Sequence, residues 1–237
     1  MVGCLFGNLA LELSSQAADV QSRLQEIFDA QIDLIEQVVA ATPPPLGGGR
    51  QAAARDRILA AADRLLYGEG IRAVGIDRIF AEAPVTRATF YRHFATKDDL
   101  VAAYLVGRSA KEREQVAALR ATMSGDAPQM LRTLLTALIA ESCGPGARGC
   151  PFINAAAEYA DPAHPVRRAV TEHRRWFHSQ MSRLAAELGH PEPDRVADQL
   201  MLLRDGVMVG GYLDDPARAG AALTAAATAI VTHRDGS

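Results

Sequence analysis

Cysteines, aromatic residues and long apolar runs are all scarce in this sequence of 237 residues. The three cysteines, Cys4, Cys143 and Cys150, form no CxxC pair, so we expect neither a disulfide framework nor a zinc site. Aromatic residues make up 5% of the chain and alanine is abundant, which favours helices over β-sheets. No run approaches the ~18 apolar residues of a membrane-spanning helix, and the N-terminus lacks the basic segment of a signal peptide. These absences predict a soluble, cytoplasmic protein with no membrane contact.

The charge of the chain is unevenly distributed, although its net value is only −3. Residues 1–49 hold one basic residue against six acidic ones, whereas residues 85–97 hold three basic residues and no acidic one. A local basic patch attracts phosphate groups even on a nearly neutral protein, because salt screens the distant charges. On charge alone, an ordinary solvated helix face is an equal alternative.

Apolar residues recur with the period of an α-helix, and no segment shows the alternation of a strand. The sequence therefore predicts an all-α fold. Prolines followed by glycines over residues 42–49 stop helices and are typical of a linker, so we place a boundary there. Helices are expected over residues 18–41, 55–67, 76–83, 87–94, 97–122, 126–142, 151–160, 163–188, 193–213 and 216–233.

The beginning of the chain resembles a later part of it. Residues 3–41 align without gaps on residues 149–187, and both copies contain the pattern Gly-Cys-x-Phe-x-Asn-x-Ala-x-Glu. We interpret residues 1–49 as an N-terminal extension that derives from a related C-terminal region. Its apolar stripe needs a surface to cover it, so we expect this acidic segment to pack on the helical body or across a dimer, away from DNA.

Two short helices, over residues 76–83 and 87–94, are separated by only a few residues and flanked by longer helices. This order is typical of a helix-turn-helix DNA reader, whose second helix enters the major groove. Phe90 and Phe94 lie four residues apart and are expected to face the core, whereas the small Ala88 allows a close approach to DNA. Lys97 falls in the first turn of the next helix, where a positive charge beside exposed backbone N–H groups suits a phosphate.

The stretch from Ile76 to Leu100, which contains Thr86-Arg87-Ala88-Thr89-Phe90-Tyr91-Arg92-His93-Phe94, resembles the signature of the tetracycline-repressor (TetR) family. The resemblance is strong over residues 53–105 and weaker beyond, where it extends to Leu203-Arg204-Asp205-Gly206. It implies a homodimeric repressor that binds a palindromic operator in double-stranded DNA and is released by a small-molecule effector. The family pattern places DNA contacts at Thr86, Arg87, Thr89, Tyr91, His93 and Lys97.

The resemblance also implies a division into the N-terminal extension (1–49), a helix-turn-helix DNA-binding domain (50–105) and an effector-binding and dimerisation domain (106–237). One position departs from the family pattern: Pro84 stands where the family usually has a glycine. Because proline disfavours the α conformation in the residue before it, we expect Ala83 to leave the α region and the turn to differ locally.

Aromatic and methionine side chains at helical spacing are candidates for lining the effector pocket that the resemblance implies. They are Tyr104, Phe152, Trp176, Phe177, Met181, Met201 and Met208. Plain core packing is the alternative for each of them. His173 and His178 are five residues apart, a poor spacing for one metal ion on one helix, so no metal or cofactor is expected. No GxSxG, HExxH or P-loop motif occurs, so we expect no enzymatic activity.

The last two predicted helices are candidates for a dimer interface, with packing inside the chain as the alternative. Apolar and small residues line one side of each: Val196, Leu200, Leu203, Val207, Gly210 and Gly211 on the first, and Ala221, Ala222, Ala225, Ala226, Ala229 and Ile230 on the second. Small residues there allow helices to approach closely. A different function stays open beside repression: a helical small-molecule-binding or protein-interaction module with lost or weakened DNA binding, which Pro84 and the acidic extension make conceivable.

Overall fold

The computed structural model describes residues 48–123, 125–144 and 146–232. The chain divides into two units, residues 1–51 and 52–237, and the helical architecture is that of the second unit. The described residues form nine helices and no strand, which confirms the predicted all-α fold. None of these helices is both long and apolar enough to cross a bilayer. The helix expected over residues 18–41 and the first copy of the repeat lie outside the described residues.

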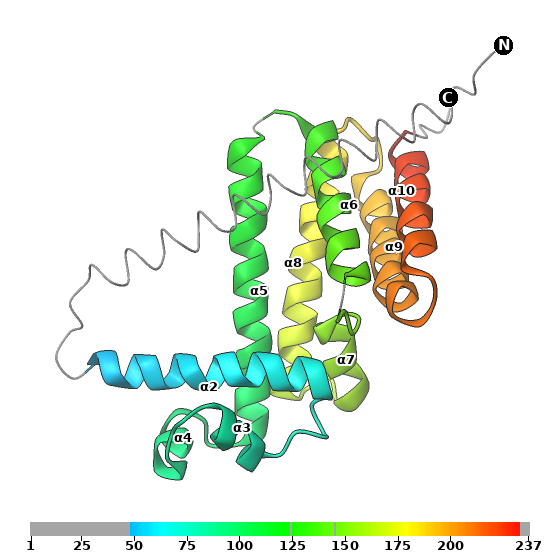
Figure 1. Ribbon diagram of the computed structural model, residues 1–237. Helices are drawn as coiled ribbons and strands as arrows, with labels where there is room; N and C mark the ends of the chain where they lie inside the picture. The colour runs from blue at the N-terminus through cyan, green and yellow to red at the C-terminus, as the bar shows by residue number, and fades with distance from the viewer. Residues whose placement is uncertain (1–47, 124, 145, 233–237) are drawn as a thin grey trace. The chain divides into compact units, whose positions relative to one another are not determined.

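Three helices form one end of the molecule, against the first turns of a long fourth helix (Figure 1). They are α2 (Gly48–Glu69), α3 (Ile76–Glu82) and α4 (Arg87–His93), and the long helix is α5 (Lys97–Thr122). Ile58, Ile79, Phe90 and Leu100 are fully buried where these four helices meet. This small core holds α3 and α4 in place beneath α2.

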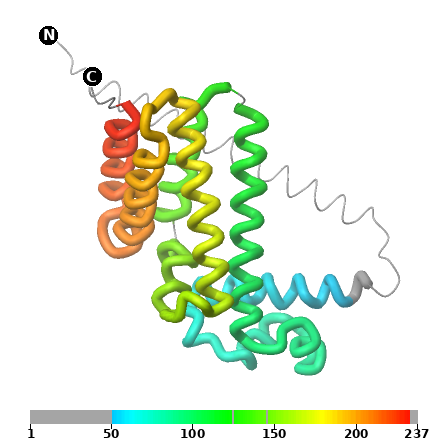
Figure 2. The backbone as a smooth tube through the Cα atoms, turned by 180° about the vertical axis from the view of Figure 1, so that it is seen from behind, coloured from blue at the N-terminus to red at the C-terminus, as the bar shows by residue number. Residues whose placement is uncertain are grey.

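The remaining five helices form a bundle with the rest of α5: α6 (Ala127–Cys143), α7 (Pro151–Glu158), α8 (Pro165–Glu187), α9 (Pro193–Leu213) and α10 (Pro216–Thr232). The bundle seen from behind shows α5 and α8 side by side, with α10 outermost (Figure 2). Helix α9 packs on α6, α8 and α10. Because α5 runs from the small end through the bundle, it connects the two parts directly.

Helix starts follow the sequence closely. Helices α7, α8, α9 and α10 each begin with a proline, the residue that fits a first helical position because its missing N–H would have no partner there. The start of α2 differs from the prediction, since it begins at Gly48 and not near Arg55. Glycine costs about 1 kcal/mol in a helix, and the alanine-rich segment that follows extends the helix back over residues expected in the linker.

Candidate functional site

The turn between α3 and α4 takes the shape that Pro84 imposes. Ala83 adopts an extended conformation, with φ −100° and ψ 108°, as the clash with the proline ring requires. The N–H of Val85 donates to the carbonyl of Ala83 across the proline, at 2.6 Å, a bond spacing typical of a γ-turn. The prediction for Ala83 is therefore confirmed, and among the described residues positive φ angles occur at glycines alone.

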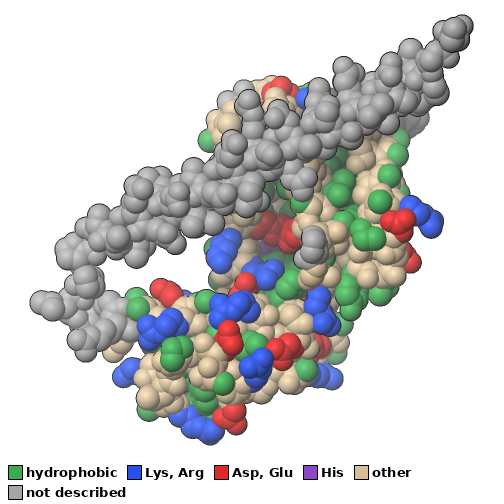
Figure 3. Space-filling view, in the orientation of Figure 1, with side chains coloured by type: hydrophobic (Ala, Val, Ile, Leu, Met, Phe, Trp, Pro, Cys, Tyr) green, Lys and Arg blue, Asp and Glu red, His purple; other side chains and the backbone are tan. Residues whose placement is uncertain are grey.

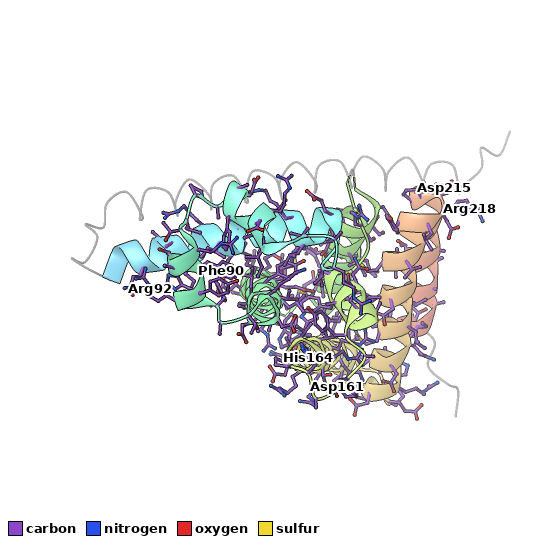
Figure 4. The ribbon with its side chains drawn as sticks, turned by 90° about the horizontal axis from the view of Figure 1, so that it is seen from below. Phe90, Arg92, Asp161, His164, Asp215 and Arg218 are labelled. Carbon is purple, nitrogen blue, oxygen red and sulfur yellow. The ribbon has the colours of Figure 1, made fainter. Side chains whose placement is uncertain are left out.

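Helix α4 is anchored by capping at its start and by aromatic rings at its core face. The Thr86 side chain accepts the backbone N–H of Thr89 at 3.2 Å, an N-cap bond that satisfies one of the free donors at the helix end. Phe90 is fully buried and meets the edge of Phe80 at 5.2 Å between ring centroids. Phe90 lies on the side of α4 toward α5, whereas Arg92 lies on the opposite side (Figure 4).

Most of the predicted DNA contacts lie together on the outer face of α4 and beside it. Thr86, Arg87 and Tyr91 are exposed, and Thr89 and Lys97 are half-buried. Several of their polar atoms have partners within the protein. Arg87 donates to the Asp77 carboxylate at 2.6 Å, and the hydroxyl groups of Thr86 and Thr89 lie 2.9 Å apart. Lys97 Nζ donates to the Ile71 carbonyl at 2.5 Å.

His93 differs from the other predicted contacts because its ring is half-buried at the end of α4. Its Nε2 atom lies within the protein without a hydrogen-bond partner, and the ring lies 6.4 Å from that of Phe94. A role for His93 at DNA therefore requires its side chain to turn outward.

Three of the residues predicted for the effector pocket meet around His173, in the helical bundle. The ring of Phe152, from α7, stacks on the imidazole at 3.6 Å between centroids, with planes 2° apart. Trp176 and Phe177 follow on α8 at 5.7 and 6.3 Å from the same imidazole. These rings bring α7 and α8 together.

The other candidates are more scattered. Tyr104 and Met208 are buried in the same apolar cluster as Phe152, and Met181 packs with Phe177 in a neighbouring cluster. Met201 is buried but belongs to neither cluster. The alternative of core packing fits Met181 and Met208, whereas Tyr104 also lines a cavity of about 270 Å³.

The structure adds polar residues to this aromatic group that were not predicted from the sequence. Ser109 and Glu112 from α5 approach His173 at 3.2 Å (Oγ to Nδ1) and 3.5 Å (Oε2 to Nε2). Arg204 from α9 is buried, with its guanidinium 4.8 Å from the Phe177 centroid and 3.6 Å from the sulfur of Cys150. The sequence signal for Arg204 was its position directly after four apolar residues of α9, Leu200 to Leu203.

Helix α7 links this aromatic and polar group to the helix-turn-helix part. The Tyr159 hydroxyl, just after α7, donates to Asp98 at 2.7 Å. His164, at the start of α8, contacts the same carboxylate at 3.3 Å and stacks on the Tyr159 ring at 4.6 Å. Because Asp98 follows Lys97 directly, these contacts connect the end of α7 to the residue beside a predicted phosphate contact.

The expected association surface on α9 is only partly exposed. Val196, Leu200 and Val207 are buried inside the bundle, so for these residues the alternative of packing within the chain is correct. Other apolar side chains of α9 face outward instead, with Leu202 73% and Leu213 68% exposed. A groove of about 580 Å³ runs between α9 and α10, and the exposed Ala222 of α10 lines it.

Comparisons with known proteins agree with this architecture. A family model described as bacterial regulatory proteins, tetR family, matches residues 58–104, and a model of the tetracyclin repressor-like C-terminal domain matches residues 127–230. No match was found among curated proteins. Together the two family models span more than half of the chain.

Solved structures point the same way. The crystal structure of SCO4454, a TetR-family transcriptional regulator from Streptomyces coelicolor, is 44% identical, with a TM-score of 0.72 over 76% of this chain and 95% of that one. A TetR transcriptional regulator from Chloroflexus aurantiacus has the same fold at 24% identity, with a TM-score of 0.65 over 78% and 97% of the two chains. The protein therefore belongs to the TetR family of transcriptional regulators, with a helix-turn-helix DNA-binding domain.

Proposed function

We propose that the protein is a repressor that binds a palindromic operator as a homodimer through residues 86–97 and is released by a small molecule bound in its helical bundle. The observation that carries the proposal is the outer face of α4. Thr86, Arg87 and Tyr91 are exposed there, on a helix held rigidly by the buried Phe90. Side chains that can reach base edges on a well-anchored helix are what a major-groove reader requires.

The homodimer is supported by the apolar surface of α9 and by the geometry of operators. One chain carries one reading helix, whereas a palindrome presents two equivalent half-sites that a two-fold symmetric dimer matches. Leu202 and Leu213 are mostly exposed, and leaving large apolar side chains in water is unfavourable. A second copy that covers them across α9 and α10 would place the two reading helices as a pair.

Release by an effector is supported by the position of α7. Phe152 near its start belongs to the aromatic group around His173, and Tyr159 just beyond its end holds Asp98 beside Lys97. A molecule that displaces the Phe152 ring would therefore shift the start of α5 and, with it, the spacing of the reading helices. Ligand binding at the aromatic group then changes the position of the DNA-binding helices, which is the requirement for coupling between two sites.

The test is binding of the full chain to the DNA that flanks its own gene, measured by fluorescence anisotropy at several salt concentrations. Lys97→Ala should weaken binding to all sequences alike and reduce the salt slope by about one unit per half-site. Arg87→Ala should cost ~1 to 3 kcal/mol of discrimination at one base pair of each half-site. Arg132→Ala, which removes an exposed arginine from α6, serves as the control and should leave both quantities unchanged.

Specific binding that survives in the Arg87→Ala/Tyr91→Ala double variant would contradict the assignment of the reading face. Absence of any specific binding by the wild-type chain would favour the alternative of a binding module without DNA recognition. A stoichiometry of one chain per operator would contradict the homodimer.

A further inference from the structure

Arginines outnumber acidic side chains where α5, α8 and α9 meet, and one of these arginines is buried. Arg204 is 4% exposed, and it shares the carboxylate of Asp205 with Arg174, at 3.2 and 2.8 Å. A third guanidinium, that of the exposed Arg113 of α5, lies 5.0 Å from the Trp176 centroid at the edge of this region. A single carboxylate thus neutralises two arginines, and a buried charge without a counter-charge is costly.

The nearest further acid, Glu112, does not supply the missing negative charge in full at neutral pH. Burial raises the pKa of this carboxyl to about 7, so the group is partly protonated near neutrality. Arg204 from α9 and Arg108 from α5 favour its charged form, whereas Glu141 from α6 opposes it. Its contact with His173, at 3.5 Å, comes from α8.

The His173 imidazole lies in the field of these same arginines. Its pKa is lowered to about 3 by burial and then by Arg204, Arg113 and Arg174, so the imidazole is neutral. The elements around it thus present three guanidinium groups that repel a positive charge at this point. The same field stabilises a negative one.

Two buried polar atoms in this region have no hydrogen-bond partner: Nε2 of His173 and Nε of Arg204. Arg113 Nε donates to the Ser109 hydroxyl at 3.3 Å, which leaves the hydroxyl proton for His173 Nδ1 at 3.2 Å. The imidazole then carries its own proton on Nε2 and offers it as a donor. Buried donors without partners cost about 1–3 kcal/mol each, so an acceptor placed beside them would be bound favourably.

The surroundings of these donors are aromatic, and a cavity of about 350 Å³ lies beside them, lined by Phe152 and Arg174 among others. The stacked Phe152 ring, Trp176 and Phe177 provide flat apolar surfaces beside His173. In the space-filling view, basic, acidic and histidine side chains are visible together in a hollow beside α5 (Figure 3). Flat aromatic rings beside hydrogen-bond donors that lack an acceptor suit a ligand with an anionic group at one end and an aromatic ring at the other.

Resting on the ligand-responsive role proposed above, we propose that the effector is an aromatic organic acid whose carboxylate is held by Arg204 and His173 and whose ring lies against Phe152 and Trp176. The carboxylate supplies the negative charge that Arg174 and Arg204 together lack. It also accepts hydrogen bonds from Nε2 of His173 and Nε of Arg204, which make none within the protein.

The same geometry couples binding to a proton. A carboxylate placed beside Glu112 disfavours a second negative charge there, so the complex holds Glu112 protonated. Because this carboxyl titrates near pH 7 in the free protein, the ligand binds to a form whose population falls tenfold for each pH unit above that value. Affinity is therefore highest in mildly acidic solution and decreases as the pH rises.

The experiment compares 2-naphthoate with its neutral analogue 2-naphthamide by calorimetry on the full chain, without DNA. Emission of Trp176, the single tryptophan of the sequence, reports whether the probe lies in this place. We expect the acid to bind at least about tenfold more tightly than the amide, since hydrogen bonds to charged groups exceed neutral ones by this order. We also expect the affinity for the acid to fall about tenfold between pH 7.5 and 8.5.

Two variants test the assigned residues. Arg204→Gln should abolish the preference for the acid, with Arg175→Gln, an exposed position on α8, as the control that keeps it. Because replacing a buried arginine can disturb folding, Glu112→Gln provides the second test: it should bind the acid at least as tightly as the wild type and with no change between pH 7.5 and 8.5.

Equal affinities for acid and amide, or no binding of the acid at about 10 mM, would overturn the inference. So would a pH dependence that Glu112→Gln leaves intact, or binding that leaves Trp176 emission unchanged. All these readouts are taken without DNA. A failure of operator binding would contradict the proposed repressor without altering them, and a failure of naphthoate binding would leave the DNA-binding result standing.

Discussion

The ion pair between Arg87 and Asp77 leads to a prediction about operator affinity. In the free protein the Arg87 guanidinium lies 2.6 Å from the Asp77 carboxylate, and the two side chains are 68% and 81% exposed. To reach a base edge or a phosphate, Arg87 must leave this partner. Asp77→Asn removes the competing charge and also a source of repulsion toward the DNA backbone, so it should tighten binding.

The magnitude follows from the exposure of the pair. Ion pairs between exposed side chains contribute about 0.2–1 kcal/mol, and a dimer on a palindrome breaks two of them. The expected gain is therefore about 0.4–2 kcal/mol for the whole complex, or roughly 2- to 30-fold in Kd. The Arg87 side chain also lies 5.5 Å from the Phe80 centroid, a contact that both forms of the protein retain.

The assay is fluorescence anisotropy with an operator duplex at constant salt concentration. Glu172→Gln removes an equal charge from an exposed position on α8 and should change affinity by less than the Asp77 variant. In an Arg87→Ala background the gain from Asp77→Asn should shrink, because the competition no longer exists. Weaker binding by Asp77→Asn, or an equal gain in both backgrounds, would refute the reasoning.

Three further outcomes are expected. Gly211→Ala should lower the free energy of unfolding by about 1–3 kcal/mol, because the added methyl would lie 2.6 Å from a backbone oxygen at the end of α6. The control Gly107→Ala, with open space around it, should be neutral or stabilising. Equal stability of the two variants in denaturant would contradict the close approach at Gly211. Tyr159→Phe removes the hydrogen bond to Asp98 and should weaken operator binding by about fivefold per protomer, while the Kd for 2-naphthoate stays unchanged. A loss of naphthoate binding with no loss of operator binding would mean that Tyr159 stabilises the helical bundle and does not act on the DNA-binding part. A chain that starts at Gly48 should retain dimerisation and bind the operator at least as tightly as the full chain, since the acidic extension repels DNA. Sedimentation measures the dimer and fluorescence anisotropy measures operator binding. Loss of the dimer would show that residues 1–47 belong to the fold.

Several features could be read from the sequence because the interactions that create them span only a few residues. The threonine caps of α4 and α5, the prolines at the starts of α7 to α10 and the conformation of Ala83 before Pro84 are all of this kind. A cap connects a side chain to a backbone group three residues away, so residue types in order are sufficient to predict it. The buried face of α4 follows in the same way from the four-residue spacing of Phe90 and Phe94.

Packing between distant segments decided the rest. Which apolar residues of α9 face solvent depended on α6, α8 and α10 packing against it, so Val196 and Leu200 became core while Leu202 did not. Periodicity shows that a helix has an apolar side, but two apolar sides on one helix can be assigned only when its neighbours are known.

The polar group around His173 is the clearest case of a feature that only the tertiary structure reveals. Ser109, Glu112, His173 and Arg204 come from three helices and are separated by up to 95 positions in the chain. In the folded chain Ser109 and Glu112 contact His173, and Arg204 and His173 both lie beside the Phe177 ring. Their unusual protonation arises from burial, and burial is a property of the assembled bundle. The sequence by itself determined where most of the helices begin and which face of α4 is buried, because both depend on residues a few positions apart. The chemistry of the interior was decided by which side chains folding brings out of water together.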